Sequence, residues 1–375
     1  MLLETTQKIE QLLTGLRPEK LWASLKFYPY ALYDSANYYL VTQHEVTQKL
    51  KQLTPTIYRG KTDERFLGNT AIDYEGSFTA IWDATTTGEL TEEEHVAMIV
   101  HEMFHAFQQE KGEQRFPNEL LGINYPLTSD NLMLRYVERK CLFQACTAEN
   151  KTVQVERLAQ FFQIRAQRQQ LIGEHLSYEK AIESVEGTAV YVEFKALQEL
   201  SSDVKLEEFI GDYLTLSSEQ LKIRLSTYHQ GLLLAVIADQ LLGHWQESFI
   251  DSQDYLSDFI EKALGDQLKS NKILESGLLL DYDAYEKRIL ANYLQKWEAE
   301  RDAIFAQFEL NKRGQLIATP VQITGIDPMN IIMKDQTVIH KHFLRIKQGD
   351  EERVLTGPVK TEIGKQLFEV HRIEW

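Results

Sequence analysis

The sequence is poor in cysteine and proline. Of 375 residues, two are cysteine and eight are proline. Cys141 and Cys146 form neither a C-x-x-C pair nor a larger cluster, which excludes a disulfide framework and favours a reducing compartment. We expect both to be small core residues on a helix. The scarcity of proline, with 43% hydrophobic residues, indicates a chain that folds around sizeable cores.

Signals for export or membrane insertion are also missing. The N-terminus, MLLETTQKIEQLL, has no basic segment, no long apolar run and no small-residue cleavage site, so we expect no signal peptide. The longest apolar run, Gly231 to Ala238, is too short to span a bilayer. The sequence therefore predicts a cytoplasmic protein that has no membrane partner.

Basic residues are fewer than acidic residues. The 40 Lys and Arg residues face 56 Asp and Glu residues, which gives a formal net charge of −16. Such a surface repels phosphate backbones, so nucleic acid is not an expected partner. Glycine-rich phosphate loops and G-x-S-x-G elbows are absent from the sequence as well.

The sequence divides into three segments with different predicted secondary structure. Residues 1–90 begin with a helix over 2–13 and continue into β-rich runs such as ALYDSANYYLV and SFTAIWDATTT, with turn chemistry at Thr54-Pro55 and Arg59-Gly60 between them. Residues 91–312 are helical, with breaks near Asn150, Gly173, Ser201, Gly243 and Gly277. Residues 313–375 contain five short strands, which predict a small all-β module of barrel or sandwich type. The predicted fold class is α+β.

The stretch MIVHEMFHAFQQ lies on a predicted helix. Thr91 and Glu94 form a capping box, and the helix is expected to end near Gly112. His101 and His105 fall one turn apart at the rim of the apolar face, where both imidazoles can reach one zinc ion. Glu102 is then positioned to activate a water molecule rather than to bind the metal.

A catalytic zinc needs a third protein ligand. A third histidine is expected at position 111 in one class of zinc peptidases, but Lys111 stands there. The alternative is a glutamate on a later helix, within ESVEGTAVYVEF. Glu186 borders the apolar stripe of that helix, which is a costly position for an unpartnered carboxylate. Glu183 and Glu193 are rival candidates.

HEMFH followed by EGTAVY resembles the gluzincin metallopeptidases, whose downstream helix often reads E-G-x-A-x-Y. The resemblance covers about residues 75 to 250 and implies a mostly helical, thermolysin-like catalytic core. It implies that Glu186 is the third zinc ligand. Aminopeptidase-like members carry a tyrosine in a Y-x-x-G helix that supports the oxyanion, and Tyr228-His229-Gln230-Gly231 matches it. By this match Tyr228 supports the oxyanion, with His229 as the second choice.

Two features depart from that family. The 81 residues from His105 to Glu186 exceed the spacing of compact members, so extra helices are expected between them. The G-x-M-E-N segment is missing, and GSFTAIWD occupies its place without the glutamate that holds a free amino terminus. Aminopeptidase specificity is therefore not predicted, although that strand could align an extended peptide as an edge strand does.

The sequence thus predicts a zinc-dependent hydrolase, specifically a peptidase acting on peptide or protein substrates. Two alternatives stay open: a non-catalytic peptide-binding or regulatory protein on the same scaffold, and a helical protein without metal. His340 and His342 share a face of a predicted strand, which we interpret as a solvated face rather than a second metal site. The oligomeric state is not predicted.

Overall fold

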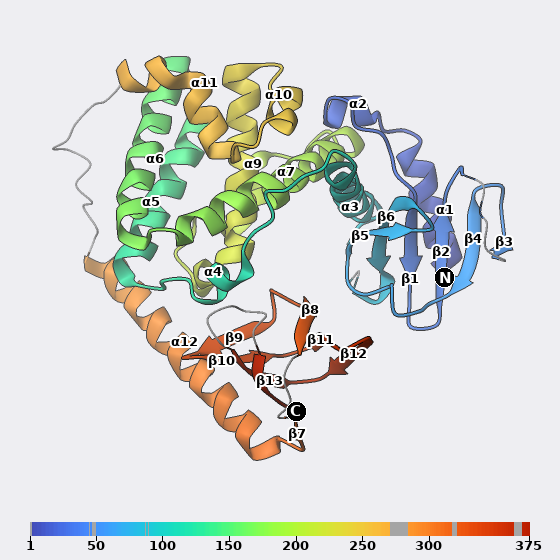
Figure 1. Cartoon of the computed structure of the whole chain (residues 1–375). Coiled ribbons are helices and arrows are strands. Elements are labelled where there is room, and N and C mark those ends of the chain that lie inside the picture. Colours follow the sequence, from blue (N-terminus) through green and yellow to red (C-terminus); the bar gives the residue numbers. More distant parts are fainter. Residues whose placement is uncertain are drawn as a thin grey trace.

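The computed structural model describes residues 2–44, 46, 50–86, 88, 90–270, 284–316, 321–363 and 370–375. Strands gather at both ends of the chain and helices lie between them, so the predicted α+β class is confirmed (Figure 1). Within these ranges, no helix is both long and apolar enough to cross a membrane.

The helices are predicted well at their ends. Thr91 caps its helix by accepting a hydrogen bond from the Glu94 N–H, and the Glu94 carboxylate accepts one from the Thr91 N–H, so the capping box is confirmed. Asn150, Gly173, Ser201 and Gly243 cap helices as expected, and Gly277 lies outside the described residues.

The α-helices are α1 (Leu2–Leu13), α2 (Pro18–Leu21), α3 (Glu92–Glu110), α4 (Glu119–Ile123), α5 (Ser129–Cys146), α6 (Lys151–Ile172), α7 (His175–Leu200), α8 (Leu206–Ile210), α9 (Ile223–Leu242), α10 (Gln246–Asp251), α11 (Leu256–Ser270) and α12 (Ala284–Asn311). Short 3-10 turns are η1 (Ala84–Thr86), η2 (Gly211–Leu214) and η3 (Ser218–Leu221).

The N-terminal strands form one six-stranded sheet in the order β3-β4-β2-β1-β6-β5. Its strands are β1 (Tyr30–Tyr33), β2 (Asn37–Val41), β3 (Lys51–Gln52), β4 (Ile57–Lys61), β5 (Thr70–Tyr74) and β6 (Ser77–Asp83). The prediction that GSFTAIWD forms an edge strand is wrong, because β6 lies between β1 and β5. Glu75 and Gly76 both have positive φ (53° and 79°) and close a tight hairpin that adds β5 outside β6.

The expected turn at Arg59-Gly60 is also wrong, because both residues lie inside β4. A Cβ at Gly60 would lie 2.2 Å from the Cζ atom of Tyr38 on the neighbouring strand. Glycine is needed there for close approach of an aromatic ring, not for a turn.

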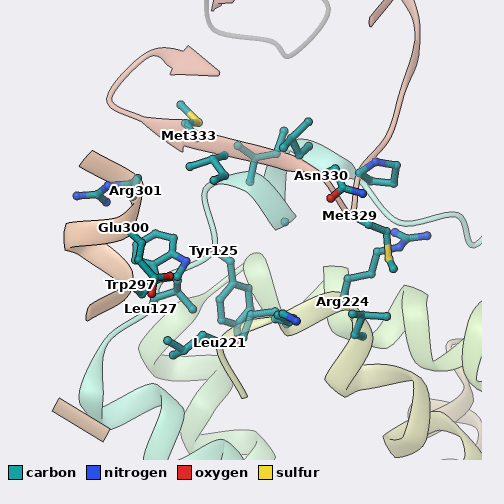
Figure 2. Close-up of a pocket in the computed structure, with 18 of the residues that line it drawn as sticks. Tyr125, Leu127, Leu221, Arg224, Trp297, Glu300, Arg301, Met329, Asn330 and Met333 are labelled. Atoms are coloured by element: carbon teal, nitrogen blue, oxygen red, sulfur yellow. The ribbon is translucent and has the colours of Figure 1, made fainter. Parts of the chain in front are cut away.

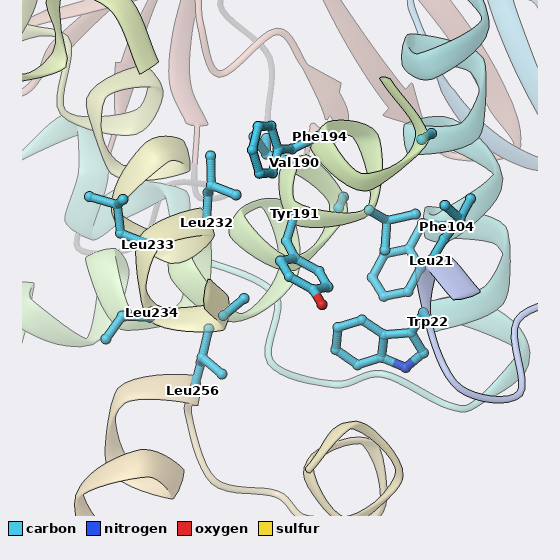
Figure 3. Close-up of a cluster of buried hydrophobic side chains, with 14 of the residues drawn as sticks. Leu21, Trp22, Phe104, Val190, Tyr191, Phe194, Leu232, Leu233, Leu234 and Leu256 are labelled. Carbon is cyan, nitrogen blue, oxygen red and sulfur yellow. The ribbon is translucent and has the colours of Figure 1, made fainter. Parts of the chain in front are cut away.

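One hydrophobic core crosses the predicted boundary at residue 90. It joins side chains of the sheet to α3, α7 and α9. Figure 3 shows the part of this core in which Trp22 and Phe104 lie near Tyr191 of α7. Trp22 is fully buried at its centre, with its ring centroid 4.9 Å from that of Phe104 and 5.0 Å from that of Trp245. Cys141 and Cys146 are buried on α5, as expected. Strand-rich, helical and strand-rich segments follow one another as the sequence indicates, but their independence as domains stays a prediction.

The helical body contains a network of buried ion pairs. Arg165 donates to Glu183 (2.7 Å) and to Glu138 (2.7 Å), and Arg168 donates to Glu138 (2.5 Å). Gln230 on α9 donates to Glu183 at 2.7 Å. Since each carboxylate is fully buried, the network ties α5, α6, α7 and α9 to one arrangement.

Helices α7 and α9 touch backbone to backbone. A Cβ at Gly187 would lie 2.3 Å from the Gly231 Cα, and one at Gly231 would lie 2.5 Å from the Glu183 carbonyl oxygen. Any larger residue at either position has to push the helices apart.

The C-terminal strands form two antiparallel sheets that share a buried cluster. The five-stranded sheet has the order β7-β14-β13-β10-β9, and the three-stranded sheet has the order β12-β11-β8. The strands are β7 (Gln315–Leu316), β8 (Gln322–Ile326), β9 (Ile331–Lys334), β10 (Thr337–His340), β11 (Phe343–Gln348), β12 (Glu351–Thr356), β13 (Val359–Ile363) and β14 (Val370–Glu374). The expected strand TVIHKHFLRIK is in fact two strands, β10 and β11, which belong to different sheets.

This split corrects the prediction for the two histidines. His340 on β10 is buried beside Thr361, with 3.1 Å between Nε2 and Oγ1. His342 lies past the end of β10, is exposed, and pairs with Asp327 at 3.0 Å. They do not share a solvated face, because the chain changes sheets between them.

We predict that Gly231→Ala destabilises the protein by about 2 kcal/mol, because the added methyl group overpacks the α7–α9 contact. Helix propensity alone gives the opposite sign, a gain of about 1 kcal/mol for alanine over glycine. Urea unfolding followed by tryptophan fluorescence measures the difference. An unchanged or increased stability would contradict the close backbone contact.

A second prediction concerns acid stability. Burial lowers the pKa of His340 from its ordinary value of 6.5 to about 4. As pH falls through this window, the unfolded chain takes up a proton that the folded chain refuses. His340 therefore lowers the free energy of unfolding as the pH falls, by about 3 kcal/mol at pH 4.

The measurement compares wild type with His340→Gln by urea unfolding between pH 7 and pH 4. The stability of wild type relative to the variant should decrease steadily as the pH falls. His342→Gln, at an exposed position, controls for the loss of a histidine as such. A difference that stays constant with pH would refute the buried, neutral state of His340.

Candidate metal centre

Two imidazoles face each other on α3. His101 and His105 lie one helical turn apart, and their Nε2 atoms are 3.2 Å from each other. Helix α3 packs on α7 on one side and on β6 and β5 on the other, so both side chains are largely buried. The spacing expected from the sequence is therefore realised.

The third member of the cluster comes from α7. The Glu186 Oε2 atom lies 3.4 Å from His105 Nε2 and 3.7 Å from His101 Nε2. Among the described residues, these three side chains form the group whose ligand atoms could hold a metal ion, and the atoms all lie within 4.8 Å of one another. The structure thus brings together the three residues that the sequence selects.

Each imidazole is oriented by a partner on its Nδ1 atom. His101 Nδ1 lies 2.9 Å from Glu193 Oε2, and His105 Nδ1 lies 2.8 Å from Gln108 Oε1. Gln108 is held in turn, since its amide nitrogen donates to the Val185 carbonyl at 2.9 Å. With Nδ1–H donating to an oxygen, loss of the second ring proton leaves the Nε2 atom with the free lone pair that a metal requires.

The same contacts decide between the three candidate glutamates. Glu183 is fully buried and accepts from Arg165 and Gln230, so its carboxylate belongs to the ion-pair network. Glu193 reaches the Nδ1 side of His101, away from the facing Nε2 atoms. Glu186 has the carboxylate that meets both Nε2 atoms.

The cluster is charged in the protein as it stands. Burial opposes charge on His101, yet Glu186 and Glu193 raise the pKa of His101 well above its ordinary value. Burial also opposes the charge of Glu186, but the two histidines and Arg224 hold the pKa of Glu186 well below its ordinary value. A bound cation would replace the protons of the two imidazoles, so metal affinity and protonation are linked.

Glu102 lies in the same buried region. Burial raises the pKa of Glu102, and the charges of His101 and His105 act against that shift. Its Oε2 atom has no hydrogen-bond partner among the described residues. A raised pKa makes the Glu102 carboxylate a stronger base than an exposed glutamate, which suits a group that accepts and returns a proton.

Sequence reasoning missed Arg224. Its guanidinium donates to Glu186 Oε1 at 2.9 Å and to Glu119 Oε1 at 2.6 Å, so it fixes the carboxylate from the side opposite the histidines. The available signal was that Arg224 is the one arginine or lysine of α9 and lies one helical turn before Tyr228.

Of the two residues expected to support an oxyanion, Tyr228 lies beside the cluster and His229 packs against aromatic rings. Burial raises the pKa of the Tyr228 hydroxyl, and the neighbouring Glu186 carboxylate raises it further, so Tyr228 is a neutral donor beside the cluster. His229 instead packs its ring against Phe209 and Tyr213, at centroid distances of 6.3 and 5.9 Å. Burial lowers the pKa of His229, with Glu193 opposing that shift. The structure therefore gives no contact between His229 and the three ligand atoms.

Comparison of the chain with models of known protein families, with curated proteins and with solved structures finds no match.

Proposed function

We propose that the protein is a zinc-dependent hydrolase, specifically a peptidase, built on a thermolysin-like helical core of the gluzincin type. The observation that carries this proposal is the meeting of His101 Nε2, His105 Nε2 and Glu186 Oε2 from two helices.

The spacing of the three atoms supports a small tetrahedral ion. Ligands at about 2.0–2.1 Å from a tetrahedral zinc lie roughly 3.3–3.4 Å from one another. The corresponding separations here are 3.2, 3.4 and 3.7 Å. Two imidazoles and one carboxylate are the donor set of many catalytic zinc sites, whereas calcium and magnesium prefer oxygen ligands.

A bound zinc ion would polarise the substrate carbonyl and acidify a water molecule. Glu102 would take the proton of the attacking water and return it to the leaving amine, a role that suits its raised pKa. Tyr228 would donate a hydrogen bond to the oxyanion. Arg224 and Glu193 would act as positioning residues, because each bonds to a ligand side chain.

The alternative is a peptide-binding or regulatory protein that holds a metal without hydrolysis. One observation favours it: the ligand side chains are at most 15% exposed, and Arg224 covers the outer oxygen of Glu186. Measurement of both bound metal and peptide turnover separates the two functions. A helical protein without metal would contain no stoichiometric zinc.

We predict that Glu186→Ala lowers zinc content from about one ion per chain to below about one tenth, because two imidazoles alone bind zinc weakly. Elemental analysis of the purified, dialysed protein measures this. Glu199→Ala, at an exposed position on the same helix, should retain the metal. Equal zinc content in wild type and Glu186→Ala would eliminate this ligand set.

We predict that Glu102→Gln keeps the zinc and lowers turnover of a quenched peptide library by about 10²–10⁴-fold, since the amide cannot accept the proton. Glu93→Gln, in the first turn of α3, is the matched control and should leave turnover unchanged. Zinc in wild type with no turnover that Glu102→Gln reduces would favour the binding protein over the hydrolase.

A further inference from the structure

A cavity of about 860 Å³ lies between the helical body and the C-terminal sheets (Figure 2). Its walls come from α4, α9, α12 and the residues around β9, so it forms where four separate parts of the chain meet. Apolar side chains line it on several sides: Leu127, Leu221, Trp297, Met329 and Met333. Its volume lies in the upper part of the range of about 300–1,000 Å³ for ligand pockets.

The charge of this cavity is opposite to that of the whole chain. Its lining contains five cationic side chains (Lys222, Arg224, Lys296, Arg301 and Lys341) against the carboxylates of Glu119 and Glu300. The chain as a whole carries a formal net charge of −16. Arg224 is paired with Glu119 and Glu186, and Arg301 lies 3.5 Å from Asp302, so the positive charge that a ligand meets comes mainly from the lysines. Positive charge of this kind inside a negative protein attracts anionic ligands into the cavity.

Two of the cationic groups are available to a ligand. Lys296 on α12 and Lys341 beyond β10 are exposed, and the described residues provide no ion pair for either. They approach the cavity from different elements. Glu119 does not compete for them, since it already accepts from Arg224.

The cavity adjoins the candidate metal centre through one side chain, Arg224. Arg224 lines the cavity and donates to Glu186, one of the three ligand residues. Glu119, on the same wall, holds the other side of the Arg224 guanidinium. His101, His105 and Glu186 do not themselves line the cavity, so a chain that occupies it is separated from the cluster by the Arg224 side chain.

We propose that this cavity binds the flanking segment of acidic peptides and so selects substrates with Asp or Glu beside the cleaved bond. The inference rests on the proposed function, which it extends to a substrate class. The mixed lining supports a peptide rather than a small anion, because an extended chain can satisfy the lysines and bury apolar side chains on Trp297 and the methionines together.

The test measures binding separately from hydrolysis. Three fluorescein-labelled octapeptides, identical except for four positions that carry Glu, Gln or Lys, are titrated into Glu102→Gln and into wild type stripped of metal by a chelator. Fluorescence anisotropy should give at least about tenfold tighter binding of the Glu peptide than of the Gln peptide, with the Lys peptide weakest. Raising the salt from 50 to 500 mM should reduce the preference.

The double variant Lys296→Glu/Lys341→Glu should lose most of this preference, by about tenfold in Kd for the Glu peptide. Lys287→Glu/Lys347→Glu is the matched control: it reverses one lysine on α12 and one in the C-terminal module, and neither lines the cavity. Its preference should stay within about twofold of the parent protein.

Three outcomes would overturn the proposal: equal affinity for the Glu and Gln peptides, equal effects of the two double variants, or complete displacement of the Glu peptide by 10 mM inorganic phosphate. The last would indicate a general anion site. If only the hydrolase proposal is wrong, the result is different: acidic peptides bind with the expected preference, but no zinc-dependent cleavage follows.

Discussion

The candidate site depends on the contact between α7 and α9 at Gly187 and Gly231. The two backbones can approach so closely only because both positions are glycine, since a Cβ on either would lie within 2.5 Å of the other helix. Glu186 precedes one glycine, and Tyr228 lies nearly one turn before the other. The crossing therefore sets the distance from the Glu186 carboxylate to Arg224 and Tyr228. It also places Gln230 against Glu183.

The ion-pair network around this crossing is more important for specificity than for stability. Desolvation of fully buried charges cancels much of their attraction, so such networks add little net free energy of folding. An arrangement of the helices that separates these pairs is strongly destabilised, because it leaves a buried charge without its partner. The fully buried Arg139 illustrates the cost: two of its nitrogens lack a partner among the described residues, and burial lowers its pKa to about 9.

The proposed peptidase chemistry and the cavity share one connecting residue. Arg224 donates hydrogen bonds to the candidate ligand Glu186 and to Glu119 of α4. Helix α4 packs through Leu120 and Ile123 against β9 and β10. The C-terminal module is therefore a wall of the cavity, and it reaches the cluster through its apolar contact with α4 and the two hydrogen bonds of Arg224.

By itself, the sequence determined features that depend on neighbours along the chain. The capping box, the length of α3, the i, i+4 pairing of His101 with His105 and the helix breaks follow from local backbone chemistry. Tertiary structure alone decided which glutamate faces the imidazoles, because Glu183, Glu186 and Glu193 differ only in what other helices present to them. The same holds for the burial of His340, the place of β6 inside its sheet and the role of Arg224. Each is fixed by partners distant in sequence, and no local pattern encodes them.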